Sequence, residues 1–186
     1  MYQIHIELLA FTPEIWRKIM VPSDILLADL HKVIQTTMGW TNSHLHQFIK
    51  ADKMYTKRFS GDQFWGESGE IDYKGMRISD LLKAEKDELI YEYDFGDGWN
   101  HKLILEKILP VNQDQELPIC IYGAMNCPPE DCGGPGGYQN LLEIIKQPTH
   151  EEYEETMTWL GGKFDPNYFN LEKVNKKLKQ RNFGMK

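Results

Sequence analysis

The chain has 186 residues, 41% of them hydrophobic and 26% charged, which is the composition of a soluble globular protein of about one domain. Asp and Glu outnumber Lys and Arg by 28 to 21, and the net charge of −7 argues against a protein that binds nucleic acid through its phosphates. No apolar stretch approaches the roughly 20 residues of a membrane span, and the N-terminus lacks the cationic region of a signal peptide. We therefore expect a cytoplasmic protein whose three cysteines are reduced.

The first part of the chain, 1–118, is predicted to be rich in strands. Alternating apolar residues predict strands over 2–10 and 15–21. Apolar residues at helical spacing over 26–37, followed by Gly39 where a C-terminal cap belongs, predict a helix. Shorter elements are expected after it: a strand over 44–50, a strand over 54–57 and a helix over 79–82 with Ser79 as its cap.

A Pro/Gly-rich loop over 119–137 separates this part from a helical extension over 138–186. Helices are predicted over 138–146, from a capping box at 149–152 to Gly161-Gly162, and from Asp165 and Asn170 onward. We predict a single α+β domain over 1–186, in which a β-grasp-like antiparallel sheet with a crossing helix carries the helical C-terminal extension. The order strand, strand, helix, strand without repeated βαβ units favours this fold over a doubly wound sheet.

The clearest local structure is a hairpin that turns near Asp97 and Gly98. A two-residue turn at these positions would place Asp94 directly opposite His101. A three-residue loop with a left-handed Gly98 would instead pair Tyr93 with His101 and give the hairpin one aromatic face. We therefore predict the three-residue loop, with His101 on the aromatic face and Asp97 at the exposed tip.

Motifs spread over nearly the whole chain resemble one known family. In chain order they are Trp16-Arg17, Val21-Pro22, Leu30-His31, Met38-Gly39-Trp40, His44-Leu45-His46-Gln47-Phe48, Tyr93-Asp94-Phe95-Gly96-Asp97-Gly98-Trp99-Asn100-His101, Pro128-Pro129-Glu130-Asp131, Gly133-Gly134, Gly137-Tyr138, Trp159, Phe164-Asp165-Pro166 and Asn175. In order and spacing they are similar to the Ri-plasmid open-reading-frame-three-like family, which includes resolvase-labelled passenger proteins of insertion elements. Members are essentially uncharacterised, so the resemblance implies a plasmid- or mobile-element-associated protein and no particular activity. The resolvase label finds no support in this acidic chain, where no Ser stands in an Arg-rich recombinase setting.

His44 and His46 are candidate metal ligands. On a strand, residues i and i+2 point to the same face about 7 Å apart, close enough to share one metal ion. A third ligand would come from His101, His31 or a carboxylate. The alternative interpretation is that one histidine packs beside Phe48 while the other caps a backbone group.

The acidic residues of the motifs have structural interpretations as well. In the predicted register Asp94 lies on the face opposite His101, so we expect Asp94 to order the strand end and Asp97 to hydrogen-bond within its own turn. Glu130 and Asp131 precede a glycine-rich loop that leads into a helix, a place where anions bind. The loop lacks a Gly-Lys-Ser/Thr motif, and its two acids would repel phosphate, so a rigid turn is favoured.

The cysteines and the basic C-terminal segment are expected to carry no separate site. Cys127 and Cys132 have a spacing found in zinc knuckles, and Cys120 is near, but no second Cys/His pair follows. We therefore predict free thiols without stoichiometric zinc. The helix expected over 170–181 carries lysines on one side and apolar residues on the other, so we predict that it docks on the domain.

Two functional hypotheses remain open. The first is a non-catalytic binding or adaptor module with a recognition surface for a protein or a small molecule. The second is a metal-dependent enzyme, a hydrolase with His44 and His46 as ligands and an acidic residue as base. The acidic charge and the absence of cofactor motifs favour the first hypothesis. Nucleic acid and membrane are not expected as partners, and a divalent metal is the one cofactor that the residues could hold.

The functional surface is predicted where polar residues occur among aromatic ones, the usual make-up of a pocket. Its candidate members are His44, His46, Asp97, His101, Glu130 and Asp131. If these segments converge, changing His46 to Ala is expected to abolish ligand or metal binding at little loss of stability.

Overall fold

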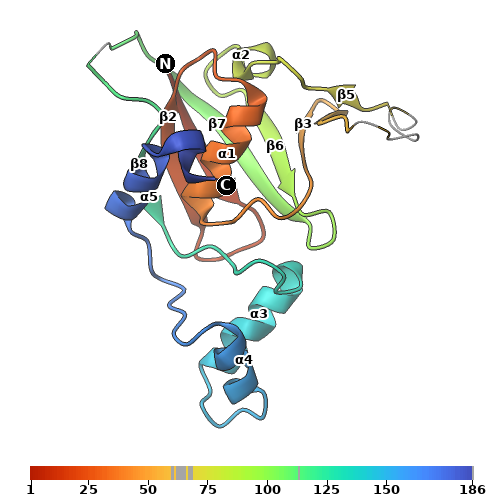
Figure 1. The fold of residues 1–186 in the computed structure, drawn as a ribbon, viewed down its shortest axis with the longest axis vertical. Helices are drawn as coiled ribbons and strands as arrows, with labels where there is room; N and C mark the ends of the chain where they lie inside the picture. Colours follow the sequence, from red (N-terminus) through yellow and green to blue (C-terminus); the bar gives the residue numbers. More distant parts are fainter. Residues whose placement is uncertain (60, 62–65, 67–68, 113, 186) are drawn as a thin grey trace.

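The computed structural model describes residues 1–59, 61, 66, 69–112 and 114–185, and these form the mixed α+β fold predicted from the sequence (Figure 1). The strands build one sheet in the order β5-β4-β3-β6-β7-β1-β2-β8, antiparallel except between β4 and β5. The strands are β1 (Tyr2–Leu8), β2 (Ile15–Val21), β3 (His46–Lys50), β4 (Lys53–Thr56), β5 (Ile71–Asp72), β6 (Glu88–Tyr93), β7 (Trp99–Ile108) and β8 (Ile119–Ala124). The helices are α1 (Leu27–Met38), α2 (Ile78–Leu81), α3 (Gly134–Ile145), α4 (Tyr153–Trp159), α5 (Leu171–Leu178) and the 3-10 turn η1 (Arg181–Gly184).

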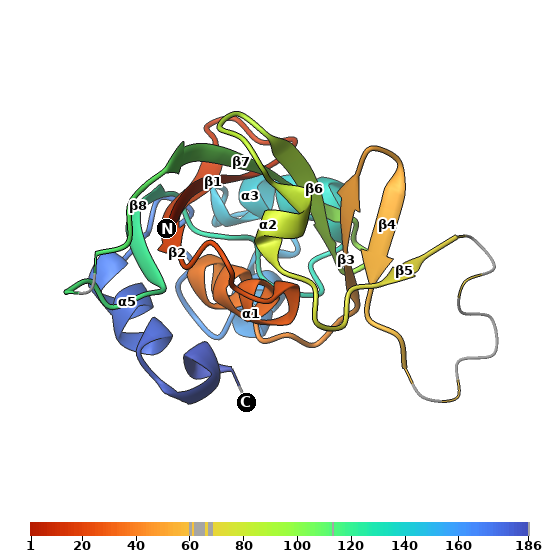
Figure 2. The same cartoon turned by 90° about the horizontal axis from the view of Figure 1, so that it is seen from above.

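The core lies between α1 and the sheet, which curves around the helix (Figure 2). Residues Leu30 and Val33 of α1 and Ile4 and Ile6 of β1 are fully buried there. Burial alternates along β1, as expected for a strand with one face on the core. The helix ends at Gly39 with a φ of 104°, the left-handed cap predicted from the sequence, because a side chain at this position would strain the backbone.

The last helices divide between two places. Helices α3 and α4 lie together as a lobe beyond one end of the sheet, whereas α5 returns to pack beside β8 (Figure 1). On α5 the Asn175 amide Nδ2 donates to the Cys120 carbonyl at 2.8 Å, and Asn175 Oδ1 accepts from the Cys120 N–H at 2.9 Å. This side chain pairs with the edge strand β8 as the backbone of another strand would. The predicted docking of the C-terminal helix is confirmed.

Some predicted boundaries are wrong. Residues 119–124 form the edge strand β8 although they were assigned to the Pro/Gly-rich loop, and α3 begins at Gly134, with Pro135 in its first turn. Strand β3 begins at His46 and not at residue 44. Helix α2 is not capped by Ser79, since its N-cap is Arg77.

The predicted register of the β6–β7 hairpin is also wrong. Tyr93 pairs with Trp99 and not with His101, because the loop holds residues 94–98 and not three residues. Asp94 has a φ of 57°, and its carbonyl accepts the Gly98 N–H at 2.6 Å, so this residue turns the chain before the predicted loop begins. The register differs by two residues, which leaves every side chain on its predicted face. His101 therefore lies on the aromatic face, and Gly98 has the predicted positive φ, 69°.

Candidate functional site

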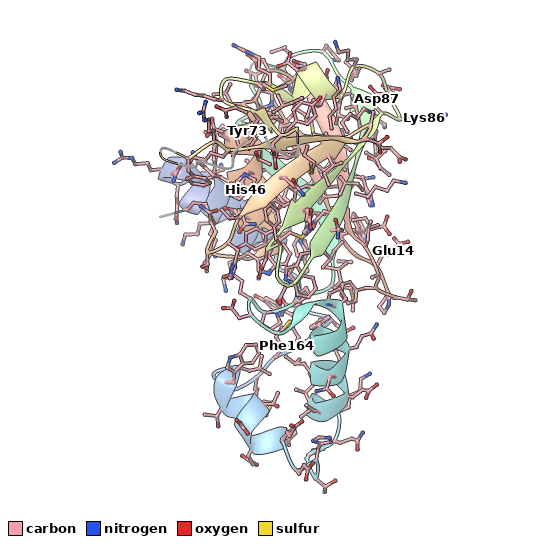
Figure 3. All side chains as sticks on the ribbon, turned by 90° about the vertical axis from the view of Figure 1, so that its right-hand side faces the viewer. Glu14, His46, Tyr73, Lys86, Asp87 and Phe164 are labelled. Atoms are coloured by element: carbon pink, nitrogen blue, oxygen red, sulfur yellow. The ribbon has the colours of Figure 1, made fainter. Side chains whose placement is uncertain are left out.

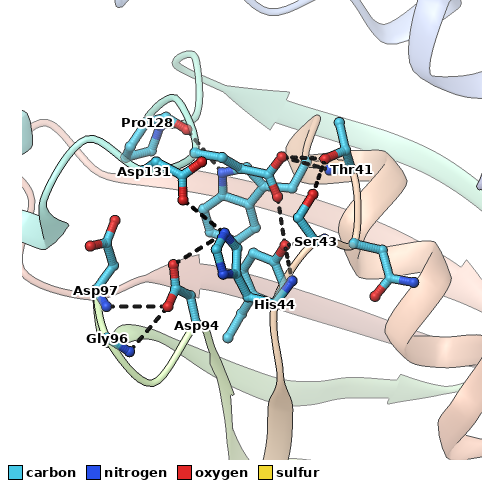
Figure 4. A network of polar contacts seen from close by, with 12 residues as sticks. Thr41, Ser43, His44, Asp94, Gly96, Asp97, Pro128 and Asp131 are labelled. Carbon is cyan, nitrogen blue, oxygen red and sulfur yellow. Dashed lines mark hydrogen bonds and ion pairs between the residues drawn. The ribbon is translucent and has the colours of Figure 1, made fainter.

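Three segments distant in sequence meet where the sheet adjoins the helical lobe. They are residues 41–44 after α1, the 94–98 loop between β6 and β7, and residues 127–132 before α3 (Figure 4). The 94–98 loop is also in close contact with the start of α3, because a Cβ atom at Gly134 would lie 2.5 Å from the Asp97 carbonyl oxygen. A glycine is required at this position both by that approach and by its φ of 68°. We call this meeting of the three segments the junction.

His44 faces two carboxylates at the junction. Its Nε2 atom lies 2.9 Å from Asp131 Oδ1 and 3.6 Å from Asp94 Oδ2 (Figure 4). One ligand atom from each of the three residues lies within 4.8 Å of the others, so the set could hold a metal ion. The sequence did not predict that Asp94 faces His44, because in the predicted register Asp94 only ordered the end of the strand.

Glu130 occupies the other side of the junction. Its Oε1 atom accepts the hydroxyl proton of Tyr93 at 2.5 Å, while Oε2 accepts hydrogen bonds from the Thr41 N–H, at 3.2 Å, and from the Thr41 hydroxyl. The Tyr93 oxygen in turn accepts the Ser43 N–H at 2.9 Å. Burial and the Glu130 carboxylate raise the pKa of Tyr93, so the phenol remains a donor. These contacts hold Glu130 in one orientation.

His46 does not belong to the junction. Its ring stacks on His31 with centroids 3.5 Å apart, and its Nε2 atom is hydrogen-bonded to the Tyr73 hydroxyl at 2.8 Å (Figure 3). Burial, and then the neighbouring His31, lower the pKa of His46 to about 2. The prediction that His44 and His46 share one face is wrong, because His44 precedes the strand and side-chain alternation begins only at His46.

His101 is also separate from the junction carboxylates, since it is fully buried. Its Nδ1 atom lies 3.1 Å from the Trp99 carbonyl and 3.2 Å from the Tyr91 carbonyl, and burial lowers its pKa to about 4. The ring is therefore a neutral donor within the core, and its inclusion among the candidate surface residues is corrected.

A hydrogen-bonded network around His31 connects α1 to β6. The Asn42 amide oxygen lies 2.6 Å from His31 Nε2, so this nitrogen carries the proton, and Nδ1 accepts from the Tyr91 hydroxyl at 2.7 Å. The Gln35 amide donates to the same hydroxyl oxygen at 3.0 Å. Burial lowers the pKa of His31 to about 4, which keeps the ring neutral. His31, proposed from the sequence as a third metal ligand, is thus a structural residue.

Arg17 is buried without a carboxylate partner among the described residues. Its guanidinium donates to the Thr37 carbonyl at 2.8 Å, to the Ala124 carbonyl at 2.7 Å and to the Met125 carbonyl at 2.9 Å, and it lies 4.3 Å from the centre of the Phe169 ring. This residue ties the end of α1 to the segment that leads from β8 into the junction.

The cysteines near the junction are free thiols. Burial raises the pKa of Cys127 to about 12, and burial together with the Asp97 carboxylate raises that of Cys132 to about 12. Both groups are therefore protonated at neutral pH.

A pocket of about 420 Å³ opens beside Glu130, between the end of α1 and the helical lobe. Its walls include Trp40, Trp159 and Phe164, and Glu130 is the one charged residue among the described residues that line it. Trp40 is fixed by a hydrogen bond from its indole N–H to the Pro128 carbonyl at 2.9 Å, whereas Trp159 is 51% exposed. The pocket thus has one rigid aromatic wall and one accessible one.

The fold and the junction define a single-sheet α+β protein with a helical lobe, and comparison with known proteins identifies its family. Residues 1–173 match the model of the plasmid pRiA4b ORF-3-like proteins, and the chain belongs to this family, as the resemblance predicted. It is 40% identical over 169 residues to "Uncharacterized protein y4hQ" of Sinorhizobium fredii, a match that covers 88% of this chain and 83% of that protein.

The fold is also similar to a solved structure, that of a protein of unknown function, MM3350, from Methanosarcina mazei Go1. The two share 39% sequence identity with a TM-score of 0.82, over 93% of this chain and 96% of that one. Among the helices in the described part of the chain, none is long and apolar enough to cross a membrane.

Proposed function

We propose that the protein is a non-catalytic binding module of the cytoplasm and that its ligand enters the pocket beside Glu130. One observation carries this proposal: aromatic side chains of Trp40, Trp159 and Phe164 line a volume of about 420 Å³ in which Glu130 is the single charged group that the structure describes. A pocket of this size with aromatic side chains in its walls suits a small molecule or a projecting side chain of a partner protein.

The chemistry of the lining favours a cationic ligand with an apolar body. Glu130 is oriented by Tyr93 and Thr41, and the lining, as far as the structure describes it, contains no Lys or Arg that would neutralise it. A tryptophan face attracts cations as well, by about 0.5–2 kcal/mol depending on solvation. An amine carried on an aromatic or aliphatic group would satisfy both features.

The surroundings of the titratable groups support binding over hydrolysis. The second hypothesis required His44 and His46 to act on one ion, but His46 is a neutral ring bonded to Tyr73. The Cys127 thiol, which lines the pocket, has a pKa of about 12 and is a poor nucleophile. In this proposal a β-grasp-like part, 1–118, and the helical extension form one domain, and the pocket lies where they adjoin.

Binding of two matched probes tests the proposal. We expect tryptamine to shift the indole N–H signals in a ¹H–¹⁵N NMR titration, and indole-3-propionate, which carries the opposite charge, to bind at least about tenfold more weakly. Trp159→Ala and Glu130→Gln should each weaken tryptamine binding by about tenfold, ~1.4 kcal/mol. Tyr122→Ala, at a side chain that is 63% exposed on β8, is the control and should leave binding unchanged. Equal binding of both probes, or of tryptamine to all variants, would refute the proposal.

A further inference from the structure

We propose that His44, Asp94 and Asp131 form a binding site for a divalent transition-metal ion at the junction. Each residue offers one ligand atom, and these atoms lie within 4.8 Å of one another. They belong to the stretch before β3, the β6–β7 loop and the loop before α3, and their side chains point toward one another (Figure 4). This site is independent of the ligand proposed for the neighbouring pocket.

The distances suit ligands of a shared ion. Two ligands about 2.1 Å from a metal lie roughly 3 Å apart at right angles and roughly 3.4 Å apart at tetrahedral angles. His44 Nε2 lies 2.9 Å from Asp131 Oδ1 and 3.6 Å from Asp94 Oδ2. This Nε2 atom is screened from solvent, yet it makes no hydrogen bond within the described part of the chain. A nitrogen that makes ion-pair contacts with two carboxylates but is hydrogen-bonded to neither is positioned to ligate a metal ion.

Asp94 supplies a second, independent indication. The residue is only 8% exposed, and its Oδ1 atom accepts the Gly96 N–H at 3.0 Å and the Asp97 N–H at 3.3 Å. Its Oδ2 atom faces His44 and accepts no hydrogen bond from any residue that the structure describes. A carboxylate on a largely buried residue is unfavourable unless a positive charge lies beside it, and a bound metal ion would supply that charge. Asp97 Oδ2, in the same loop, is itself buried without a hydrogen-bond partner among the described residues.

The ligand types indicate the class of ion. One imidazole nitrogen with two carboxylate oxygens suits Zn²⁺ or Mn²⁺, with water completing the coordination. Ca²⁺ requires about 6–8 oxygen ligands and Mg²⁺ prefers oxygen alone, so both are disfavoured. Cys132 is adjacent to Asp131 in sequence, but its sulfur is not among the described ligand atoms that lie within 4.8 Å of one another.

Metal titration of the full chain, purified without an affinity tag and treated with a chelator, tests the proposal. We expect calorimetry to show one Zn²⁺ per chain, together with a higher midpoint of thermal unfolding. Asp131→Asn, at a side chain that is 69% exposed and so free to change, should lower Zn²⁺ affinity by at least about tenfold. His44→Gln should do the same. Asp52→Asn, in the exposed β3–β4 turn, is the matched control and should bind as the unchanged chain does.

Variants of the two cysteines distinguish the proposed site from a metal site formed by the thiols. A variant with Cys127→Ser and Cys132→Ser should retain Zn²⁺, and Co²⁺ bound to the unchanged chain should show no thiolate charge-transfer absorption. Loss of binding in the cysteine variant with retention in Asp131→Asn would assign the ion to the thiols and overturn the proposal. Absence of binding at millimolar Zn²⁺ would overturn it as well. Thermal unfolding of each variant shows whether it is folded. If Asp131→Asn does not fold, the Zn²⁺ affinity of His44→Gln decides between the two outcomes.

Discussion

The histidines of the motif-bearing segments fall into two regions with opposite surroundings. His31 and His101 are at most 4% exposed, and they and His46 contact hydroxyls, an amide and backbone carbonyls. The His44 side chain is 29% exposed and faces the carboxylates of Asp94 and Asp131. Neutral partners suit an uncharged ring that holds the core together, whereas carboxylates suit a ring that is protonated or bound to metal. Residues of one type in one set of motifs therefore serve different purposes, and only their partners distinguish them.

The largest expected effect is an acid sensitivity of the buried region. Because their pKa values are lowered to about 4 for His31 and His101 and to about 2 for His46, the folded chain does not bind the protons that the unfolded chain binds below about pH 6.5. The free energy of unfolding is therefore not reduced by these rings above about pH 7. It falls as the pH decreases, by about 2 kcal/mol per ring and about 6 kcal/mol in total at pH 5.

Urea unfolding at pH 7 and pH 5 measures this effect, in a range where most carboxylates remain ionised. His44→Gln should leave the difference between the two pH values largely unchanged, since the buried rings cause it. An equal stability at both pH values would show that these rings accept protons in the folded state, and the contrast between the two regions would disappear.

The next largest effect is expected for Gly134→Ala at the junction. The added Cβ would lie 2.5 Å from the Asp97 carbonyl oxygen at a φ of 68°, so we expect a loss of about 3–4 kcal/mol in the free energy of unfolding. Gly136→Ala, two residues on in α3 with no atom within 4 Å of its Cβ, is the matched control and should stabilise the protein by about 0.5–1 kcal/mol. Similar results for both variants would mean that the hairpin tip and α3 are not tightly packed.

The pair His46→Ala and His44→Ala compares the two regions directly. His46→Ala removes the ring stacked on His31 and the hydrogen bond to Tyr73, so it should reduce stability by about 2–3 kcal/mol while Zn²⁺ binding persists. His44→Ala should reduce stability by less than about 1 kcal/mol and abolish Zn²⁺ binding. These outcomes reverse the expectation from the sequence that His46→Ala would abolish binding. Denaturant titration measures the stability of both variants, and calorimetry measures their Zn²⁺ binding. A loss of Zn²⁺ binding in His46→Ala would support the original expectation from the sequence.

The smallest effect is expected for Tyr93→Phe, which removes the hydroxyl that Glu130, Ser43 and His44 share. We expect a loss of about 1–2 kcal/mol in stability, because three hydrogen bonds disappear while the ring remains packed. Tryptamine binding should also weaken, since Glu130 is no longer held in one orientation. Tyr55→Phe, at a partly buried tyrosine of β4, serves as a control. Unchanged stability and binding would indicate that Thr41 alone orients Glu130.

The sequence predicted local structure well where one pattern decides it. Strand β2 has the predicted bounds, and α1 ends at the predicted Gly39, because apolar spacing and a left-handed glycine each act over a few residues. The α+β class and the family follow from such local patterns as well. The junction was anticipated in part, since His44, Glu130 and Asp131 were named as candidate residues and lie there.

Tertiary structure alone decided which residues the junction unites. Asp94 joins His44 because a left-handed turn at this residue lengthens the hairpin loop, and a turn that depends on one side chain leaves no periodic signal. His46 leaves the predicted pair because the strand begins two residues later than its pattern suggested. The sequence by itself thus determined the fold class, the family and most elements, through short-range spacing. The partners of each histidine depend on long-range packing, which no local pattern specifies.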